Sequence, residues 1–233
     1  MQSDTRLVCL IACVVLIIGL AQSMPVVLSS DDIDANYEQA PEAIRSTKSW
    51  LGLFIEQAQT GGERGRSRLA ETRIRFVDSG EPGAGQRMET TPPNPTLLVS
   101  GVHNIAPGPA ITATRFVDLS HDKPEAEIRL GERVYTIHLV SRAADYCDAV
   151  ISLTSGTLMQ KVFDLRNRPP QWSCDDPHFR VHWAGDLDRD GKLDMLVTFS
   201  EKYSYHPRQL FLSSTARPPD FVAEVARFER FSQ

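Results

Sequence analysis

The sequence has no surplus of basic residues, and this shortage disfavours one large class of function. Acidic residues outnumber lysine and arginine by 30 to 25, which gives a net charge of −5 at pH 7. Proteins that bind nucleic acid normally present a basic surface, so no nucleic-acid partner is expected. The arginines between Arg64 and Arg75 have Glu63 and Glu71 as neighbours and are typical of a solvated strand face.

Short catalytic signatures are also missing. The sequence contains no HExxH motif of a zinc protease, no CxxC pair and no GxSxG nucleophile turn. A nucleophile–base pair around His103 and Asn104 stays an open alternative, although no neighbouring residue singles it out. The sequence therefore assigns no catalytic residue and favours a binding or structural protein over an enzyme.

Only one hydrophobic run is long, and it covers residues 7–20. One basic residue, Arg6, precedes the run, and the small-x-small sequence AQS follows it at residues 21–23. These features predict a secretory signal peptide over residues 1–23 and a secreted or periplasmic protein. A membrane anchor is the alternative, but the run of about 14 residues is shorter than the ~20 that a spanning helix needs. We expect no membrane span after cleavage.

Cysteine is scarce, with four residues in the whole chain. Cys9 and Cys13 lie in the predicted signal peptide, so Cys147 and Cys174 remain. Two cysteines in an oxidising compartment most simply pair with each other, which predicts a disulfide. The bridge would close a loop of about 28 residues and stabilise the fold by about 3.6 kcal/mol on the chain-entropy model. A reactive thiol is the less favoured alternative.

Helical periodicity is missing after residue 60, where strand patterns recur instead. Residues 24–48 are acidic and weakly patterned and are expected to form an N-terminal tether. Residues 49–233 are expected to form a β-domain, with a proline-rich and glycine-rich loop at 79–96 that is either a seam between two subdomains or a long surface loop. The predicted strands cover residues 49–57, 68–78, 96–102, 110–119, 126–130, 133–141, 149–155, 157–165, 178–186, 192–200, 209–214 and 221–231. We therefore predict an all-β protein, an antiparallel sandwich or irregular barrel of about a dozen strands.

One short stretch, GDLDRDGKLDMLV at residues 185–197, concentrates negative charge beside a hydrophobic run. Its aspartates occupy positions 1, 3, 5 and 9 of the pattern D-x-D-x-D-G-x-x-D, and these residues are Asp186, Asp188, Asp190 and Asp194. Like charges at this density repel unless a cation lies between them. Carboxylate oxygens in a tight loop suit Ca²⁺, which takes 6–8 oxygen ligands, and the backbone carbonyl of Lys192 at position 7 would add one more.

The residues around this loop separate it from an EF-hand. An EF-hand has helices on both sides and a bidentate Glu at position 12, where this chain has Val197. Apolar residues at 179, 181 and 183 alternate with polar ones before the loop, which predicts a strand on that side. We therefore predict a strand–loop–strand calcium site in which Asp194 is the bidentate ligand. An acidic turn that binds nothing, or one that binds Mg²⁺ or Mn²⁺, is the alternative.

The same stretch resembles the calcium loop of integrin-type FG-GAP and VCBS repeats, in which this spacing joins two β-strands. Residues 182–214 also resemble a module of uncharacterised exported bacterial proteins. The resemblance implies a Ca²⁺ site with Asp186, Asp188, Asp190, the Lys192 carbonyl and Asp194 as ligands. Arg189 departs from the small residue that is common at position 4. Such repeats usually occur several times in a propeller, but this chain has one copy, so a propeller is not expected.

Two further groups of side chains carry possible chemistry. His178 and His182 are four residues apart on a predicted strand, about 13 Å from end to end, which is too far for one zinc ion. They are expected at the surface or at a rim. Tyr203, Tyr205 and His206 suit an aromatic platform for a sugar or peptide, but rings that cover the edge of the core are the favoured interpretation.

These observations favour an exported calcium-binding β-domain with a structural calcium loop. Such a domain would serve as a binding or structural module, with a cell-envelope polymer or a protein as its partner. The alternative is an extracellular hydrolase with a calcium-supported site. A third class, an inhibitor or companion of another exported protein, would present an apolar patch on an edge strand.

Overall fold

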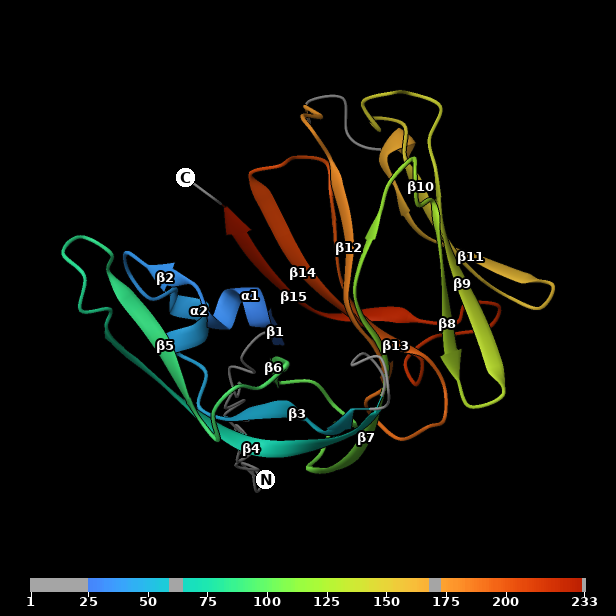
Figure 1. The fold of residues 1–233 in the computed structure, drawn as a ribbon. Coiled ribbons are helices and arrows are strands. Elements are labelled where there is room, and N and C mark those ends of the chain that lie inside the picture. The colour runs from blue at the N-terminus through green and yellow to red at the C-terminus, as the bar shows by residue number, and fades with distance from the viewer. Residues whose placement is uncertain (1–24, 59–64, 168–172, 232–233) are drawn as a thin grey trace, which may run out of the picture.

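The computed structural model describes residues 25–58, 65–167 and 173–231, and these residues fold into two antiparallel β-sheets (Figure 1). This confirms the prediction of an all-β, antiparallel protein. The predicted signal peptide, with Cys9 and Cys13, lies outside the described residues. Within the described ranges, the helices are too short and too polar to cross a membrane.

The larger sheet has 11 strands and curls until its first and last strands approach each other. Its main path runs through β1 (Val26–Ser29), β6 (Leu97–Ser100), β3 (Trp50–Ala58), β4 (Gly65–Asp78), β7 (Gly108–Leu119), β12 (His178–Asp186), β13 (Asp194–Ser200), β14 (Tyr205–Leu212) and β15 (Ala223–Phe231). Two further strands, β2 (Asn36–Tyr37) and β5 (Gln86–Thr91), extend from β4. Because β1 also packs against β14 and β15, the sheet forms the irregular, nearly closed barrel that was one of the two predicted architectures.

The smaller sheet packs beside β7 and β12 (Figure 1). It contains β8 (Glu125–Leu130), β9 (Arg133–Val140), β10 (Val150–Ser155) and β11 (Leu158–Asp164), and a 3-10 turn, η1 (Leu165–Asn167), follows β11. Its inner face contributes Ile137 and Leu153 to a core that also contains Phe179 and Val197 of the larger sheet. The two sheets therefore share a hydrophobic core.

A bulge in β12 divides its side chains between two cores. The pairing of β12 with β13 shifts register between Val181 and Trp183, so His182 is the extra residue at that point. Val181 packs in the core between the sheets, whereas Trp183 packs in a second core and donates a 2.9 Å hydrogen bond to Thr112 Oγ1. The bulge thus fixes where the side chains on either side of it point.

The segment expected to be an acidic tether packs as part of the domain. Residues 25–48 form β1 and β2 with two single-turn helices, α1 (Ser30–Ile33) and α2 (Glu42–Arg45). Val27 and Leu28 are fully buried, since β1 pairs with β6. The short apolar run before the acidic residues is sufficient to form an edge strand. The acidic composition of the whole segment hides this strand signal in the sequence.

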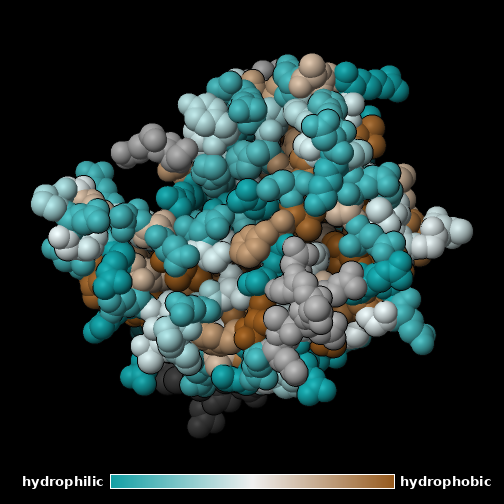
Figure 2. All heavy atoms as spheres, in the orientation of Figure 1, coloured by the Kyte–Doolittle hydropathy of each residue, from teal (hydrophilic) through white to brown (hydrophobic). Residues whose placement is uncertain are grey.

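The segment 79–96 differs from the expected loop because it contains β5, which pairs with residues 73–78 of β4. The glycines and prolines of the segment lie before and after β5. They disfavour strand pairing only at their own positions and leave β5 free to pair. Figure 2 shows that the face of the molecule seen in Figure 1 is largely hydrophilic, and that it is hollowed between the lobe with β2 and β5 and the ends of β14 and β15.

The predicted disulfide is present. Cys147 lies in the connection before β10, and Cys174 lies shortly before β12, with 5.8 Å between their Cα atoms. The bridge therefore connects the smaller sheet to the start of the strand that carries the aspartate loop at its other end.

Candidate metal centre in the β12–β13 loop

The aspartate loop is the connection between two buried strands. β12 ends at Asp186 and β13 begins at Asp194, and Gly185 is paired with Asp194 in the antiparallel register. Leu187 and Leu193, just inside the two ends of the loop, are 0% and 1% exposed. Burial of these two leucines draws the ends of the loop into the protein and leaves its polar middle at the surface. This confirms the strand–loop–strand context predicted for residues 185–197.

Two glycines allow this local path. A Cβ atom on Gly185 would collide with the Ile111 carbonyl oxygen of β7, so only glycine permits the close approach of β12 to that strand. Gly191 has a φ of 74°, in the left-handed region that suits glycine. Arg189 also has a positive φ, 71°, and its exposed side chain reaches the Pro107 carbonyl at 3.4 Å, away from the aspartates.

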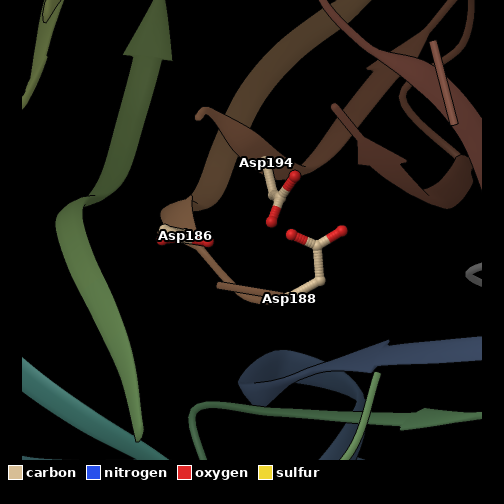
Figure 3. Close-up of side chains that lie close together, drawn as sticks. All are labelled: Asp186, Asp188 and Asp194. Atoms are coloured by element: carbon tan, nitrogen blue, oxygen red, sulfur yellow. The ribbon is translucent and has the colours of Figure 1, made fainter. Parts of the chain in front are cut away.

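Three carboxylates converge inside this loop. Oxygen atoms of Asp186, Asp188 and Asp194 lie within 4.8 Å of one another, and Figure 3 shows the carboxylates of Asp188 and Asp194 facing each other. Asp194 is 0% exposed and Asp186 is 5% exposed. Oδ2 of Asp188 is buried and accepts no hydrogen bond within the described part of the chain. The loop therefore concentrates negative charge, and Oδ2 of Asp188 has no hydrogen-bond donor among the described residues.

Backbone amides hold two of these carboxylates in place. Asp186 accepts hydrogen bonds from the amides of Arg189 at 2.7 Å and Gly191 at 3.1 Å. Asp194 accepts one from the amide of Leu187 at 2.7 Å, and one from the amide of Ser213 at 2.9 Å. The amides fix the orientation of the two carboxylates before any ligand binds.

The electrostatic cost of the arrangement appears in the pKa values. Burial, together with the neighbouring charges of Asp188 and Asp190, raises the pKa of Asp194 to about 7 against the opposing effect of the backbone amides. Burial likewise raises the pKa of Asp186. In both residues, removal from water is the main cause, so the charged form gains most from a cation at this place.

Asp190 and Lys192 stand outside the converging group. The Asp190 carboxylate accepts hydrogen bonds from the Lys192 amide and from Ser213 Oγ, both at 2.8 Å. The exposed Lys192 side chain has its Nζ atom 3.7 Å from Asp190 Oδ2. The structure thus brings together three of the four predicted aspartates, and the roles of Asp190 and of the Lys192 carbonyl as ligands stay predictions.

Ser213 is a part of the site that the motif does not contain. It follows the end of β14, and its hydroxyl group lies 2.8 Å from Asp190 Oδ2 and 3.2 Å from Asp194 Oδ1. Pairing of β13 with β14, in which Met195 lies opposite Phe211, brings Ser213 to this place. No local sequence signal marks it, because its position depends on that strand register.

Comparisons with known proteins add no family. No family model, no curated protein and no solved structure matches the chain. The resemblance to FG-GAP and VCBS loops therefore stays a prediction that depends on residues 185–197.

Proposed function

We propose that the chain is an exported calcium-binding β-domain in which one Ca²⁺ ion stabilises the β12–β13 loop. The main support is the convergence of Asp186, Asp188 and Asp194, among which the buried Oδ2 of Asp188 has no hydrogen-bond partner in the described ranges. Burial of like charges is unfavourable without a compensating partner. A divalent cation between the three carboxylates removes both the repulsion and part of the desolvation cost.

The donor set favours calcium among the divalent cations. All the converging atoms are carboxylate oxygens, which are hard ligands, and the described part of the cluster contains no histidine or cysteine. Calcium also tolerates irregular geometry, whereas Mg²⁺ requires a nearly ideal octahedron. Asp190, oriented by Ser213, and the carbonyl of Lys192 are the further oxygen donors in this proposal.

The proposed role of the ion is structural. The aspartate cluster joins the end of β12 to the start of β13, and through Ser213 it reaches the end of β14. A bound ion would hold three neighbouring strand ends together. We propose that the chain acts as a binding or structural module through the ordered surface around these strand ends. The proposed partner of this surface is a cell-envelope polymer or a protein.

Export is supported by the paired cysteines. A structural disulfide such as the bridge between Cys147 and Cys174 is typical of proteins in an oxidising compartment. A secreted or periplasmic location also agrees with the signal peptide proposed for residues 1–23.

The test is a calcium titration of the chain without residues 1–23, with Asp188→Ala as the variant. Asp188 suits this purpose because, among the residues that the structure describes, its carboxylate accepts a single long hydrogen bond, 3.3 Å from the Asp190 amide, so its removal spares the fold. We expect saturable Ca²⁺ binding in the parent. At a calcium concentration about 100 times Kd, linkage predicts a rise in melting temperature of about 5–10 °C.

Asp122→Ala is the matched control, because Asp122 is an exposed aspartate in the turn between β7 and β8. This variant should respond to calcium as the parent does, whereas Asp188→Ala should not respond. A parallel titration with Mg²⁺ identifies the preferred ion. Identical melting curves of the parent with calcium and with a chelator would contradict the proposal.

A further inference from the structure

A polar cleft of about 460 Å³ lies at the other end of β12 from the aspartate loop. Its basic and imidazole side chains come from β12, β14 and β15, and they are His178, Arg180, His182, His206, Arg208 and Arg230. His178 and Asp186 occupy opposite ends of β12, roughly 26 Å apart for a strand of this length. The cleft is therefore a separate place from the candidate metal centre.

The structure corrects the expectation that His182 is a surface or rim residue. His182 is only 3% exposed, because the bulge in β12 turns it inward and α1 lies close to it. His178 is partly buried, and its Nε2 atom lies 3.2 Å from Nδ1 of His206. Both histidines thus belong to the wall of the cleft.

His182 is joined to Arg208 by hydrogen bonds through Thr198. Buried Arg208 donates from Nη1 to Thr198 Oγ1 at 2.7 Å, because a guanidinium group can only donate. The Thr198 hydroxyl group lies 2.9 Å from Nε2 of His182, and while it accepts from Arg208 its own hydrogen is free to point at that nitrogen. Burial, with the charges of Arg208 and Arg180, lowers the pKa of His182 to about 2, so the ring is neutral. We assign the single ring hydrogen to Nδ1, because this nitrogen faces the Asp31 carboxylate, which can only accept.

This Nδ1 atom is a buried donor that lines the cleft and has no hydrogen-bond partner among the described residues. Two guanidinium nitrogens approach the same point as Nδ1, and all three surround one oxygen of Asp31, a residue of α1. The distances to Asp31 Oδ2 are 3.6 Å from Arg180 Nη1, 3.7 Å from His182 Nδ1 and 3.9 Å from Arg208 Nη2. Each distance is too long for a hydrogen bond.

The three donors thus surround one position that suits a negatively charged oxygen. Asp31 Oδ2 lies at this position but is too far from the donors to form hydrogen bonds with them. The other nitrogens of the two arginines are already committed. Arg180 forms a fork with the Asp118 carboxylate, and Arg208 donates from Nε to Asp32 at 2.7 Å. These pairs orient the remaining N–H groups toward the cleft. The Asp31 side chain is 40% exposed, so it can move aside.

We propose that this cleft binds the acid group of a small ligand, with one oxygen of a carboxylate or phosphate placed between Arg180, His182 and Arg208. Guanidinium and imidazole N–H donors suit both oxyanions. A cleft of this volume suits a small molecule, and Tyr203 at its edge, 59% exposed, offers an aromatic face to the body of the ligand.

Asp31 opposes binding in this proposal. Asp118 and Asp32 already neutralise two of the arginines, so affinity comes from directed hydrogen bonds more than from net charge. The Asp31 carboxylate repels an incoming anion and competes for the same donors. Asp31→Asn removes the charge without breaking a hydrogen bond to Arg180, His182 or Arg208, because all three distances to Asp31 Oδ2 are too long for one.

The test measures binding of inorganic phosphate, glucuronate and glucose by calorimetry, in the presence of a chelator so that the metal centre is empty. The proteins are the parent, Asp31→Asn, Arg180→Gln and Arg129→Gln. The last is the control, because Arg129 is an exposed arginine that pairs with Glu127 on the smaller sheet. Melting curves show whether each variant is folded.

We expect phosphate or glucuronate to bind and glucose not to bind, and the tighter of the two anions identifies the acid group. Asp31→Asn should bind about ten times more tightly than the parent, and Arg180→Gln about ten times more weakly, the effect of one charge-assisted hydrogen bond. Arg129→Gln should equal the parent. Equal affinity of the parent and Asp31→Asn, or no binding of either anion to these two proteins, would overturn the proposal. If Arg180→Gln fails to fold, the comparison with Asp31→Asn decides alone.

Discussion

At the scale of single residues, Ser213 shows how the candidate metal centre depends on a side chain outside its motif. Its amide and hydroxyl groups contact Asp194, and the hydroxyl group also contacts Asp190. The four aspartates could be named from the sequence because their spacing is local. Ser213 could not, because it is 19 residues from Asp194 and reaches it only through the pairing of β13 with β14.

Ser213→Ala tests this dependence. The change removes one hydroxyl donor from two buried or partly buried carboxylates and keeps the amide donor. We expect the free energy of unfolding to fall by about 1 kcal/mol and calcium affinity to fall several-fold, because Asp190 loses its orientation. Urea denaturation and calcium titration measure the two effects. Ser214→Ala is the control, since Ser214 is exposed, and equal behaviour of the two variants would argue against a role for Ser213.

At the scale of elements, strand prediction succeeded where alternation was long and failed where strands were short. β12 has the predicted bounds, 178–186, because Phe179 and Val181 alternate with polar residues over most of its length. β2 contains two residues, and β5 lies between prolines and glycines, so neither gives a periodic signal of its own. The extended conformation of β5 depends on its pairing with β4, and the sequence of such a short segment does not predict which strand it pairs with.

The disulfide acts at this scale, because it connects the segment before β10 to the segment before β12. Its residues are 27 positions apart, and the chain-entropy model then predicts that Cys147→Ser with Cys174→Ser lowers the free energy of unfolding by about 3–4 kcal/mol. Urea denaturation of the parent and the double variant measures the difference. Calcium affinity should be retained, because the aspartates lie at the far end of β12. An unchanged unfolding midpoint would contradict this role of the bridge.

At the scale of the whole molecule, the histidines of the cleft make stability depend on pH. Burial, followed by the charges of His206, Arg208 and Arg180, lowers the pKa of His178 from 6.5 to about 4. Between these two values the unfolded chain binds more protons than the folded one. Stability is therefore full above about pH 6.5 and is lost as the pH falls toward 4.

The corresponding prediction compares the parent with His178→Asn. Between pH 7 and pH 5, the parent should lose about 1–2 kcal/mol more of its free energy of unfolding than the variant does. Urea denaturation at the two pH values, with calcium present, measures this difference. His103→Gln, a change in an exposed loop, should behave as the parent. Parallel losses in the parent and His178→Asn would contradict the assignment.

The full order of strands in the barrel could not be predicted from the sequence, because pairings such as β1 with β6 and β7 with β12 join segments that are distant in the chain. β1 pairs with β6 and packs against β15, and a buried hydrogen bond joins Asp32 to Arg208 across 176 positions of the chain. One consequence concerns biosynthesis. The seam beside β1 cannot be completed until the C-terminal strand has left the ribosome, and contacts this distant in sequence form slowly. The barrel can therefore close only after β15 has been synthesised, so its closure is a late event in the production of the chain.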